Sequence, residues 1–480
     1  MGCRVTGRSS EVPPTVRYVD SLGSRREIQG EWLVGADGKT GIVRKHFLEP
    51  TAGIRQQAGV YPYEGVWVAS NLKLTVPTRQ THPDFLLWKL GYTPDEVPPG
   101  KPTATGRFGP HADRTWRHEF RVDDESDGPI YSEELLWEHL MPNITLERDD
   151  SRGHEFERPV EYPRDCITIM RCRPFKFVHK CVDRWYDKRT LLIGDAAHVF
   201  PPFAGQGVAS GVRDAHQLAW RLALLLEGGG DPAHRPGILD SWARERRRSV
   251  DDAAMMSKAL GTVCNNQPTL WIMAATKVLQ FLHSIPSLRR YEPIAIQERS
   301  GFRGVDGGFF LRDYNGGARL AQIHIRSSSP SRASLLSDAL LQQGGTIFTL
   351  LVIGNGDAKQ RAWWYSQAKA AIAAAALSPR IVSESSVVIY NPQDAGLPPV
   401  SDTASGLNGK SVSTPEVFSP VPTSEINIPL APGYNSASYL GRFGWSTRFV
   451  IARPDLFVFA CAKDEDQLVH CLTQLKRLSS

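Results

Sequence analysis

The sequence is short of cysteine patterns and of long apolar runs. Its seven cysteines are scattered, and none of them forms a C-x-x-C pair. This excludes a disulfide framework and the usual zinc or dithiol spacings, and it favours free thiols in a reducing compartment. No apolar run reaches the length of a membrane span. We therefore expect a cytoplasmic protein without a transmembrane segment or a metal site.

The sequence also lacks a large excess of positive or negative charge. The chain carries 56 Lys and Arg against 51 Asp and Glu, a net charge of +5 over 480 residues. A nucleic-acid binder usually shows a basic stripe, and the near-balance argues against that partner. One basic cluster, Arg244–Arg248, lies in SWARERRRSV. Its composition is typical of the solvated face of a helix.

Several catalytic motifs are absent as well. The sequence has no H-E-x-x-H, no G-x-S-x-G nucleophile elbow and no Walker loop. It also lacks a strand followed by G-x-G-x-x-G and a helix. Gly354-Asn355-Gly356 follows an expected strand but has no third glycine. A zinc protease, a serine hydrolase and a complete dinucleotide fingerprint are thus excluded from these residues.

The first 190 residues are predicted to be mainly strands. Three segments between residues 3 and 37 form a meander that ends in a buried strand, Glu31–Val34. Thr40 is the expected cap of a short helix that runs to His46. Residues 64–190 alternate aromatic and β-branched residues, which predicts an antiparallel sheet with one covered face.

The rest of the chain favours helices and then a small α/β unit. Residues 326–336 are a Ser-rich junction, and about residues 392–433 are expected to be a long loop, an insertion or a flap. The β-α-β pattern beyond the junction predicts a separate domain from about residue 315. The expected helices are Val212–Leu226, Ile238–Leu260, Leu270–Leu282, Ala362–Leu377 and Glu465–Leu475.

The stretch LLIGDAAHVFPPFAGQGVASG, residues 191–211, has the pattern of a ligand-binding loop. Leu191–Ile193 is apolar on both faces, as in a buried parallel strand, and Asp195 follows at its carboxyl end, where open α/β sheets bind ligands. Gly205 and Gly207 let a ligand approach the backbone. The next helix, expected from about Ser210, favours an anion at its start. The loop therefore suits a planar ligand with hydroxyl and phosphate groups.

These motifs resemble those of the FAD-dependent aromatic hydroxylases, the group of phenol hydroxylase and the fungal secondary-metabolism monooxygenases. Gly194-Asp195, Pro201-Pro202, Gly205-Gln206-Gly207 and Asp214-Ala215 are similar to their second FAD signature. LVGADGKTGIVR, residues 33–44, resembles their Asp-Gly motif, with Gly41 where Ser is usual. Arg244–Arg247 resembles their E-R-R segment, and Arg453-Pro454-Asp455 resembles an R-P-D segment near the end of a thioredoxin-like domain.

The resemblance implies FAD as cofactor, NADPH or NADH as reductant, and O2 and a small aromatic molecule as substrates. Asp195, with Gly194, would bind the ribityl chain, and the backbone of Gly205, Gln206, Gly207 and Val208 would face the pyrimidine end of the flavin. Pro201 and Pro202 would line the reacting side of the flavin, and Asp37 would help to hold FAD and the nicotinamide. His198 is interpreted as structural. The cofactor would carry the chemistry, while the protein orients the reactants and excludes water.

The substrate side is predicted from the strand MRCRPFKFVHK. A period of two places Arg171, Arg173, Phe175, Phe177 and His179 on one face, where an arginine could steady a phenolate or carboxylate. Pro174 is a possible point of register shift. In TWRHEFRV, residues 115–122, the aromatic face is interpreted as sheet packing.

The relatives of this group begin with the dinucleotide fingerprint that these residues lack, so the adenosine and pyrophosphate side of the FAD site is expected to be missing. The opening MGCRVT, which matches a lipidation pattern, is interpreted as interior strand sequence. Three alternatives stay open: a hydroxylase, a truncated or non-catalytic interaction protein of the same fold, and a Baeyer–Villiger or epoxidising flavoprotein. A homodimer is possible.

The predicted fold class is α/β with α+β insertions. The predicted units are a remnant of the FAD-binding domain at 1–63, a substrate sheet at 64–186, the rest of the FAD-binding domain at 187–314 and a thioredoxin-like domain at 315–480.

Overall fold

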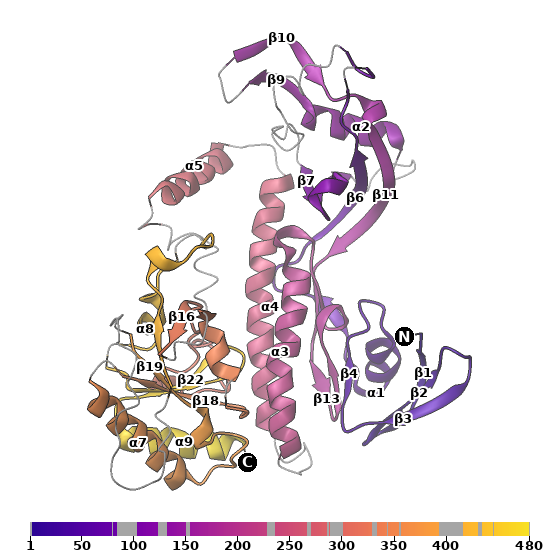
Figure 1. Ribbon diagram of the computed structural model, residues 1–480. Helices are drawn as coiled ribbons and strands as arrows, with labels where there is room; N and C mark the ends of the chain where they lie inside the picture. The colour runs from indigo at the N-terminus through magenta and orange to yellow at the C-terminus, as the bar shows by residue number, and fades with distance from the viewer. Residues whose placement is uncertain are drawn as a thin grey trace.

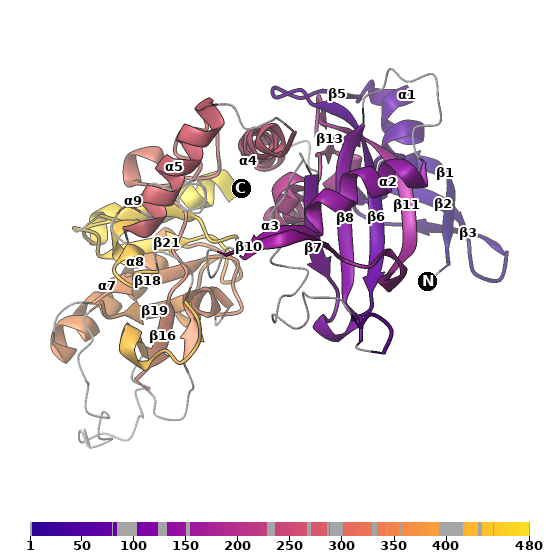
Figure 2. The same cartoon turned by 90° about the horizontal axis from the view of Figure 1, so that it is seen from above.

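The computed structural model describes residues 2–78, 80–83, 103–122, 132–149, 154–227, 236–265, 270–285, 288, 301–328, 334–342, 344–354, 357–392, 416–430, 434–444 and 446–479. Two long helices, α3 (Gln206–Glu227) and α4 (Pro236–Asn265), run side by side through the middle of the molecule. The strands of the first 200 residues lie on one side of them, and a C-terminal sheet lies on the other (Figure 1, Figure 2).

A short central sheet positions the glycine-rich loop. Its strand order is β13 (Tyr186–Asp187), β14 (Thr190–Leu192) and β4 (Leu33–Gly35). β14 pairs with β4 in parallel, and Leu191 and Leu192 are fully buried, so the predicted buried parallel strand is confirmed. β5 (Gln56–Ala58), β12 (Lys180–Val182) and β15 (His198–Val199) form a second small sheet beside it.

The expected antiparallel sheet is also present. Its order is β11 (Ile167–Val178), β6 (Glu64–Leu74), β8 (Thr115–Val122) and β7 (Thr103–Phe108). Helix α2 (Glu133–Leu140) covers one face, where Trp116 and Phe120 pack with Leu136 and Leu140. The aromatic face of β8 is therefore sheet packing, as predicted. β9 (Thr145–Asp149) and β10 (His154–Glu161) pair beyond it.

The N-terminal meander consists of β1 (Arg4–Glu11), β2 (Pro14–Val19) and β3 (Arg25–Gln29). After β4 the chain forms the π-helical turn η1 (Val43–Leu48) and the short helix α1 (Glu49–Ala52). The predicted helix over this stretch exists, but Thr40 does not cap it, because the residue before its first turn is Ile42, whose own side chain makes no cap hydrogen bond.

The C-terminal body is a seven-stranded mixed sheet with two helices packed against it. Its order is β17 (Leu335–Leu336), β16 (His324–Ser327), β20 (Val417–Pro420), β19 (Val387–Tyr390), β18 (Thr349–Ile353), β21 (Phe449–Ala452) and β22 (Val458–Ala462). α7 (Ala358–Ala375) and α9 (Glu465–Ser479) pack together and bury Ala368, Ala371, Leu468 and Leu472 in the core.

One prediction for this region needs correction. The strand β20 lies inside the stretch 392–433 that the sequence predicts as a loop, because its short apolar run pairs with β16 and β19 over a long sequence distance. Residues 393–415 of that stretch, and Asn355 and Gly356, lie outside the described residues. The thioredoxin-like assignment of this body stays a prediction.

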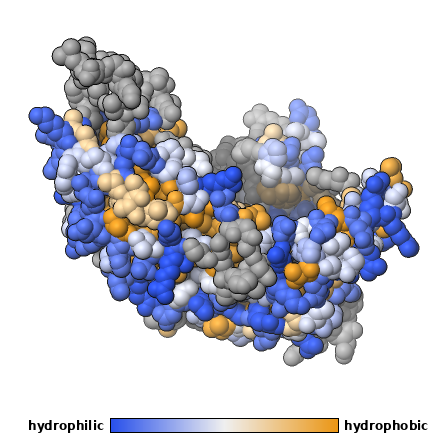
Figure 3. All heavy atoms as spheres, turned by 90° about the horizontal axis from the view of Figure 1, so that it is seen from below, coloured by the Kyte–Doolittle hydropathy of each residue, from blue (hydrophilic) through white to orange (hydrophobic). Residues whose placement is uncertain are grey.

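The predicted helices are present. Four of them extend beyond the predicted bounds, including α5, which covers Leu270–Ser284, whereas α7 begins four residues before Ala362 and ends two residues before Leu377. Among the described residues, no helix is both long and apolar enough to cross a bilayer. The face in Figure 3 is mostly hydrophilic, with hydrophobic residues in separate groups. The remaining short elements are η3 (His111–Asp113), η4 (Met141–Asn143), η5 (Arg164–Cys166), η6 (Gly194–Ala196), η7 (Phe203–Gly205), η10 (Arg312–Tyr314), η11 (Ser337–Gln342), η12 (Glu384–Ser386), η13 (Thr423–Glu425) and α8 (Ser438–Gly441).

A buried ion cluster joins the long helices to the C-terminal body. Glu245 of α4 accepts hydrogen bonds from Arg221 of α3 at 2.7 Å and from both terminal nitrogens of Arg453 at 2.8 and 2.7 Å. Arg453 also donates through Nε to Asp455 at 2.8 Å, and the Phe309 N–H donates to Glu245. Arg221, Glu245 and Arg453 are fully buried. Two arginines and two carboxylates thus neutralise one another between the two halves.

This cluster corrects the prediction that Arg244–Arg248 is a solvated face. Arg244 and Arg248 are exposed, but Glu245 and Arg246 have no exposed surface. The segment therefore alternates between solvent and the helix–helix interface, with its inward charges paired. Composition alone could not reveal this, because the partners come from α3 and from residues two hundred positions away.

Candidate functional site

The loop after β14 exposes an aspartate at the carboxyl end of the central sheet. Gly194 has a φ of +59°, which glycine adopts without strain, and it turns the chain into η6. The Asp195 carbonyl accepts a hydrogen bond from Gln56 Nε2 at 3.0 Å. Asp195 is exposed, and no described residue hydrogen-bonds to its carboxylate. Asp195 is therefore fixed by its backbone, and its carboxylate is available to a ligand.

Asp214 of α3 holds this loop in place. Its Oδ2 accepts hydrogen bonds from the Gly194 N–H and from His198 Nε2, both at 2.8 Å, and its Oδ1 accepts from Arg246 Nε at 2.6 Å. All of these side chains are fully buried. Burial alone would raise the pKa of Asp214, but Arg246, His198 and the Gly194 N–H outweigh it and hold that pKa below its ordinary value. The contact with Asp214 supports a structural role for His198.

The glycines of the loop leave open space. At Gly194, Gly205 and Gly207, an added Cβ would meet no atom within 4 Å, and Gly205 has a φ of +61°. The helix α3 begins at Gln206, four residues before the predicted start near Ser210. Its first N–H groups therefore lie within the Gly205–Val208 segment, where unsatisfied donors favour negative charge. Val208 is 83% exposed.

These features match the shape and polarity of a flavin. A planar ring needs open backbone, its polyol chain needs an acceptor such as an exposed carboxylate, and its electron-rich end needs donors. Gly205 and Gly207, Asp195 and the start of α3 supply these three features. The residues present thus fit the ring and ribityl side of FAD.

The two prolines connect this loop to the antiparallel sheet. Pro201 is buried, its carbonyl accepts a hydrogen bond from Ser257 of α4 at 3.3 Å, and Pro202 is exposed. Phe203 follows and packs edge-on against Trp67 of β6 and Tyr63, with ring centroids 5.1 and 5.7 Å apart. The loop therefore presents an aromatic contact to the face of the sheet opposite α2.

The predicted substrate residues share that face. Arg173 lies opposite Ala69 in the register, Phe175 opposite Trp67 and Phe177 opposite Gly65. The Phe175 and Phe177 rings stack at 6.2 Å, and the Arg171 guanidinium lies 5.3 Å from the Phe175 ring centre. Because Trp67 contacts Phe203, this face is turned toward the loop of residues 194–208, the predicted flavin loop. Phe175 and Phe177 lie nearest to that contact in the register.

The register shift in β11 occurs before Arg171 rather than at Pro174. The pairing with β6 is irregular between Ile169 and Arg171, and it is regular across Pro174. His179 follows the strand and is buried, with Nδ1 2.9 Å from the Tyr61 carbonyl and its ring stacked on Phe200. Burial lowers the pKa of His179. His179 therefore belongs to the packing beneath the proline loop.

Asp37 lies in a second turn and caps the helical turn η1. Its Oδ2 accepts a hydrogen bond from the Val43 N–H at 2.9 Å, the role that the sequence assigned to Thr40. Gly41 makes this possible, because a Cβ there would lie 2.1 Å from Asp37 Oδ1. In this chain the carboxylate thus occupies the space of the Ser that the resemblance leads one to expect. Its role toward FAD and nicotinamide stays a prediction.

Replacing Gly41 by Ser is expected to destabilise the protein by about 1–2 kcal/mol, because the new side chain displaces Asp37 from the Val43 N–H. Urea unfolding of G41S, D37A and the double variant measures this effect. The two changes remove one cap, so the double variant should lose little more than the larger single loss. Strict additivity of the two losses would contradict this account.

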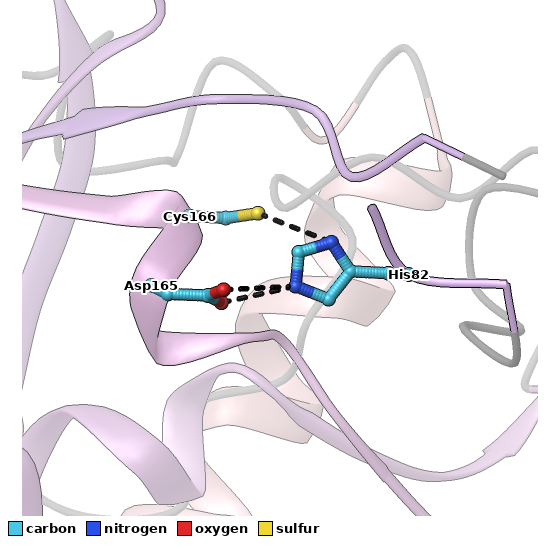
Figure 4. A group of neighbouring side chains, drawn as sticks. All are labelled: His82, Asp165 and Cys166. Atoms are coloured by element: carbon cyan, nitrogen blue, oxygen red, sulfur yellow. Dashed lines mark hydrogen bonds and ion pairs between the residues drawn. The ribbon is translucent and has the colours of Figure 1, made fainter. Parts of the chain in front are cut away.

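Another group of ligand-type side chains lies at the far end of the sheet. His82 Nε2 is 3.0 Å from Asp165 Oδ1, and its Nδ1 is 3.9 Å from Cys166 Sγ (Figure 4). The two partners thus face different ring nitrogens, and one ligand-type atom from each of the three residues lies within 4.8 Å of the other two. Burial raises the pKa of the Cys166 thiol. In the structure, His82 thus contacts both Asp165 and Cys166 directly.

Sequence reasoning missed the roles of Asp214, Arg246 and Gln56. Asp214 and Arg246 belong to the motifs quoted above, but the sequence does not indicate that the two side chains pair with each other. The available signal was an acid on the apolar face of α3 and a base on the facing side of α4, which together require a buried pair.

The fold is similar to that of solved flavin-dependent monooxygenases. Residues 157–257 match the FAD binding domain family. The chain aligns with solved structures of flavin-dependent monooxygenase PieE, in complex with FAD and substrate, and of aklavinone-11 hydroxylase with FAD and aklavinone. The TM-score is 0.58 for both, at 17% and 16% identity, over 99% of this chain and 76% and 74% of theirs. The predicted fold class is confirmed.

Two curated proteins are similar in sequence. One is the "Probable NADH-specific resorcinol 4-hydroxylase" of Rhodococcus jostii (strain RHA1), 29% identical over 52% of this chain and 39% of its own length. The other is the 3-(3-hydroxy-phenyl)propionate/3-hydroxycinnamic acid hydroxylase of Escherichia coli O81 (strain ED1a), 28% identical over 58% and 43%. The chain thus spans about two fifths of the length of these relatives. The resemblance to FAD-dependent aromatic hydroxylases is confirmed.

Proposed function

We propose that this chain forms the flavin-ring and substrate side of an FAD- and NAD(P)H-dependent monooxygenase that hydroxylates a phenolic or polyketide-derived ring. One observation carries the proposal. The exposed Asp195 and the open Gly205–Gly207 backbone belong to one loop. Phe203 of the same loop packs onto the aromatic face of the proposed substrate sheet. The names of the similar proteins, which include hydroxylases of phenols and of aklavinone, support it.

The residues of this chain would act by binding and orientation. Asp195 would accept hydrogen bonds from the ribityl hydroxyls, and the N–H groups at the start of α3 would stabilise negative charge on the pyrimidine end of the ring. When bound, FAD would supply electron transfer from the nicotinamide donor to O2 and oxygen transfer to the substrate.

The antiparallel sheet would hold the substrate. Phe175 and Phe177 offer aromatic surface against which a ring can stack, and Arg171 or Arg173 would pair with a phenolate or carboxylate. Pro201 and Phe203, both buried, would keep water from the space between the loop and the sheet. A ring stacked there would lie beside the cofactor.

Replacing Asp195 by Ala is expected to weaken FAD binding about 10- to 100-fold, because a charge-assisted hydrogen bond to the ribityl chain is lost. The melting temperature should not change, since Asp195 is exposed and its carboxylate holds no described partner. Fluorescence titration of the purified chain with FAD, and in parallel with riboflavin, measures the affinity. The matched control is D313A, which removes another exposed aspartate on η10.

Riboflavin is included because it carries the ring and the ribityl chain without the adenosine. Both ligands should respond to D195A and neither to D313A. With FAD bound, a phenolic substrate should accelerate NADH or NADPH oxidation and yield a product heavier by one oxygen atom. Absence of flavin binding to the purified chain, or equal affinity of the parent and D195A, would refute the proposal.

A further inference from the structure

A small cavity lies apart from the flavin loop, between the long helices and the C-terminal body. Its volume is about 110 Å3. Arg213 and Gln217 of α3 and Asp252 of α4 line one side, and Arg319, Asp455 and Phe457 line the other. Figure 1 shows α3 and α4 between the two halves of the molecule. None of the residues assigned to the flavin or the aromatic substrate lines this cavity.

The two carboxylates at the cavity already have cationic partners outside its lining. Asp455 accepts hydrogen bonds from Arg453, and Asp252 pairs with Arg248 at 3.0 Å. Arg213 differs from both. It donates to Gln206 Oε1 at 3.2 Å and to Ser210 Oγ at 3.0 Å, and it forms no ion pair with a carboxylate in the described ranges. The charge of Arg213 therefore faces neutral partners.

Two other arginines act on the charge of Arg213, and Asp214 opposes them only in part. Burial lowers the pKa of Arg213 to about 10, and the charges of Arg246 and Arg319 act in the same direction. A partly buried guanidinium among like charges is stabilised when an anion joins it. The cavity beside Arg213 and Arg319 is where such an anion fits.

The remaining polar atoms specify the kind of anion. Arg213 Nε is a buried donor without a hydrogen-bond partner in the described structure, and Gln217 Oε1 is a buried acceptor without one. Gln217 is only 2% exposed. A ligand that satisfies both needs acceptor oxygens and one O–H donor. A hydrogen phosphate has both, whereas chloride and a carboxylate have no donor.

We propose that this cavity binds a singly protonated phosphate group, either free hydrogen phosphate or the monoanion of a phosphate monoester, through Arg213, Arg319 and Gln217. The space suffices for the anion and a water, since a water takes up about 30 Å3. Arg213 also holds Gln206 of the flavin loop, so the occupant contacts a residue that reaches that loop. The proposal concerns a different site from the flavin and stands without it.

Calorimetric titration of the full chain with inorganic phosphate in a phosphate-free buffer tests this proposal. We expect saturable binding that chloride at matched ionic strength does not reproduce. R213Q should weaken the phosphate affinity at least about tenfold, because a charge-assisted contact is lost. The control variant R312Q removes an exposed arginine of η10 and should bind phosphate as the parent does.

A second variant, Q217L, removes the acceptor and keeps both arginines. It should also weaken phosphate binding, and it decides the matter if R213Q does not fold. Competition of phosphate by NADPH but not by NADH would identify a monoester as the occupant, and no competition by either would identify the free ion. Absence of saturable binding, or unchanged affinity in the folded variants, would overturn the proposal.

Discussion

Replacing Glu245 by Gln is expected to lower the free energy of unfolding by about 3–5 kcal/mol. Glu245 is fully buried and accepts hydrogen bonds from Arg221 and Arg453. The amide has nearly the same shape but no charge, so two guanidinium groups would remain in the interior with only Asp455 to balance them. Urea unfolding of the full chain measures the loss, with D306N as control.

Asp306 forms an ion pair with Arg312, but its side chain is 92% exposed. Removing that pair should change the stability by less than about 1 kcal/mol, because water already screens it. The comparison separates the burial of the charge from the mere presence of an ion pair. Equal losses in E245Q and D306N would show that the cluster does not hold the two halves together.

The same variant should change the acid stability. Burial alone would raise the pKa of Glu245, but Arg221 and Arg453 outweigh it and lower that pKa from 4.5 to about 2. A carboxyl whose pKa is lower in the folded state stabilises fully above its unfolded pKa. This contribution is therefore lost as the pH falls from 4.5 toward 2. E245Q should show a flatter decline of stability over that range, and parallel declines would contradict the assignment.

The strand and turn of the loop after β14 were predictable because their signals are local. The apolar run Leu191–Ile193 predicted a buried strand, and the order of Asp195, two prolines and two glycines predicted a ligand-binding turn at its end. The alternation along β11 likewise placed Phe175 and Phe177 on one face, since a strand repeats every two residues. Neither prediction depends on a contact with a residue far away in the sequence.

The incorrect predictions concern residues whose structure depends on a contact with a residue or strand elsewhere in the sequence. Asp37 rather than Thr40 caps η1, because the absent side chain of Gly41 leaves room for the carboxylate. The sequence predicts Arg246 as a surface residue, but it is buried because it pairs with Asp214 of α3. The strand β20 exists because β16 and β19 flank it, and its own four residues are too few to predict it. Periodicity carries no information about such partners.

Replacing Asp214 by Asn is expected to disturb stability and flavin binding together. The carboxylate bonds three groups, the Gly194 N–H, His198 and Arg246. An amide has one acceptor oxygen, so it cannot serve all three, and Arg246 would keep a buried charge without its counterion. We expect a loss of about 3–5 kcal/mol in the free energy of unfolding. Flavin affinity should also fall, because Gly194 positions Asp195.

The contrast with D195A identifies the role of Asp214. D195A should reduce flavin affinity at constant stability, whereas D214N should reduce both. The double variant D214N/R246M removes the buried arginine that has lost its counterion, so it should be more stable than D214N alone. It should recover less of the flavin affinity than of the stability. This follows because methionine fills the space of the arginine stem but cannot restore the anchor on the Gly194 N–H. Unfolding curves and flavin titrations of the three variants measure both quantities. An outcome in which D214N kept the parental stability and lost only flavin affinity would contradict this account. Asp214 would then act on the ligand directly, and its buried hydrogen bonds would not position the loop.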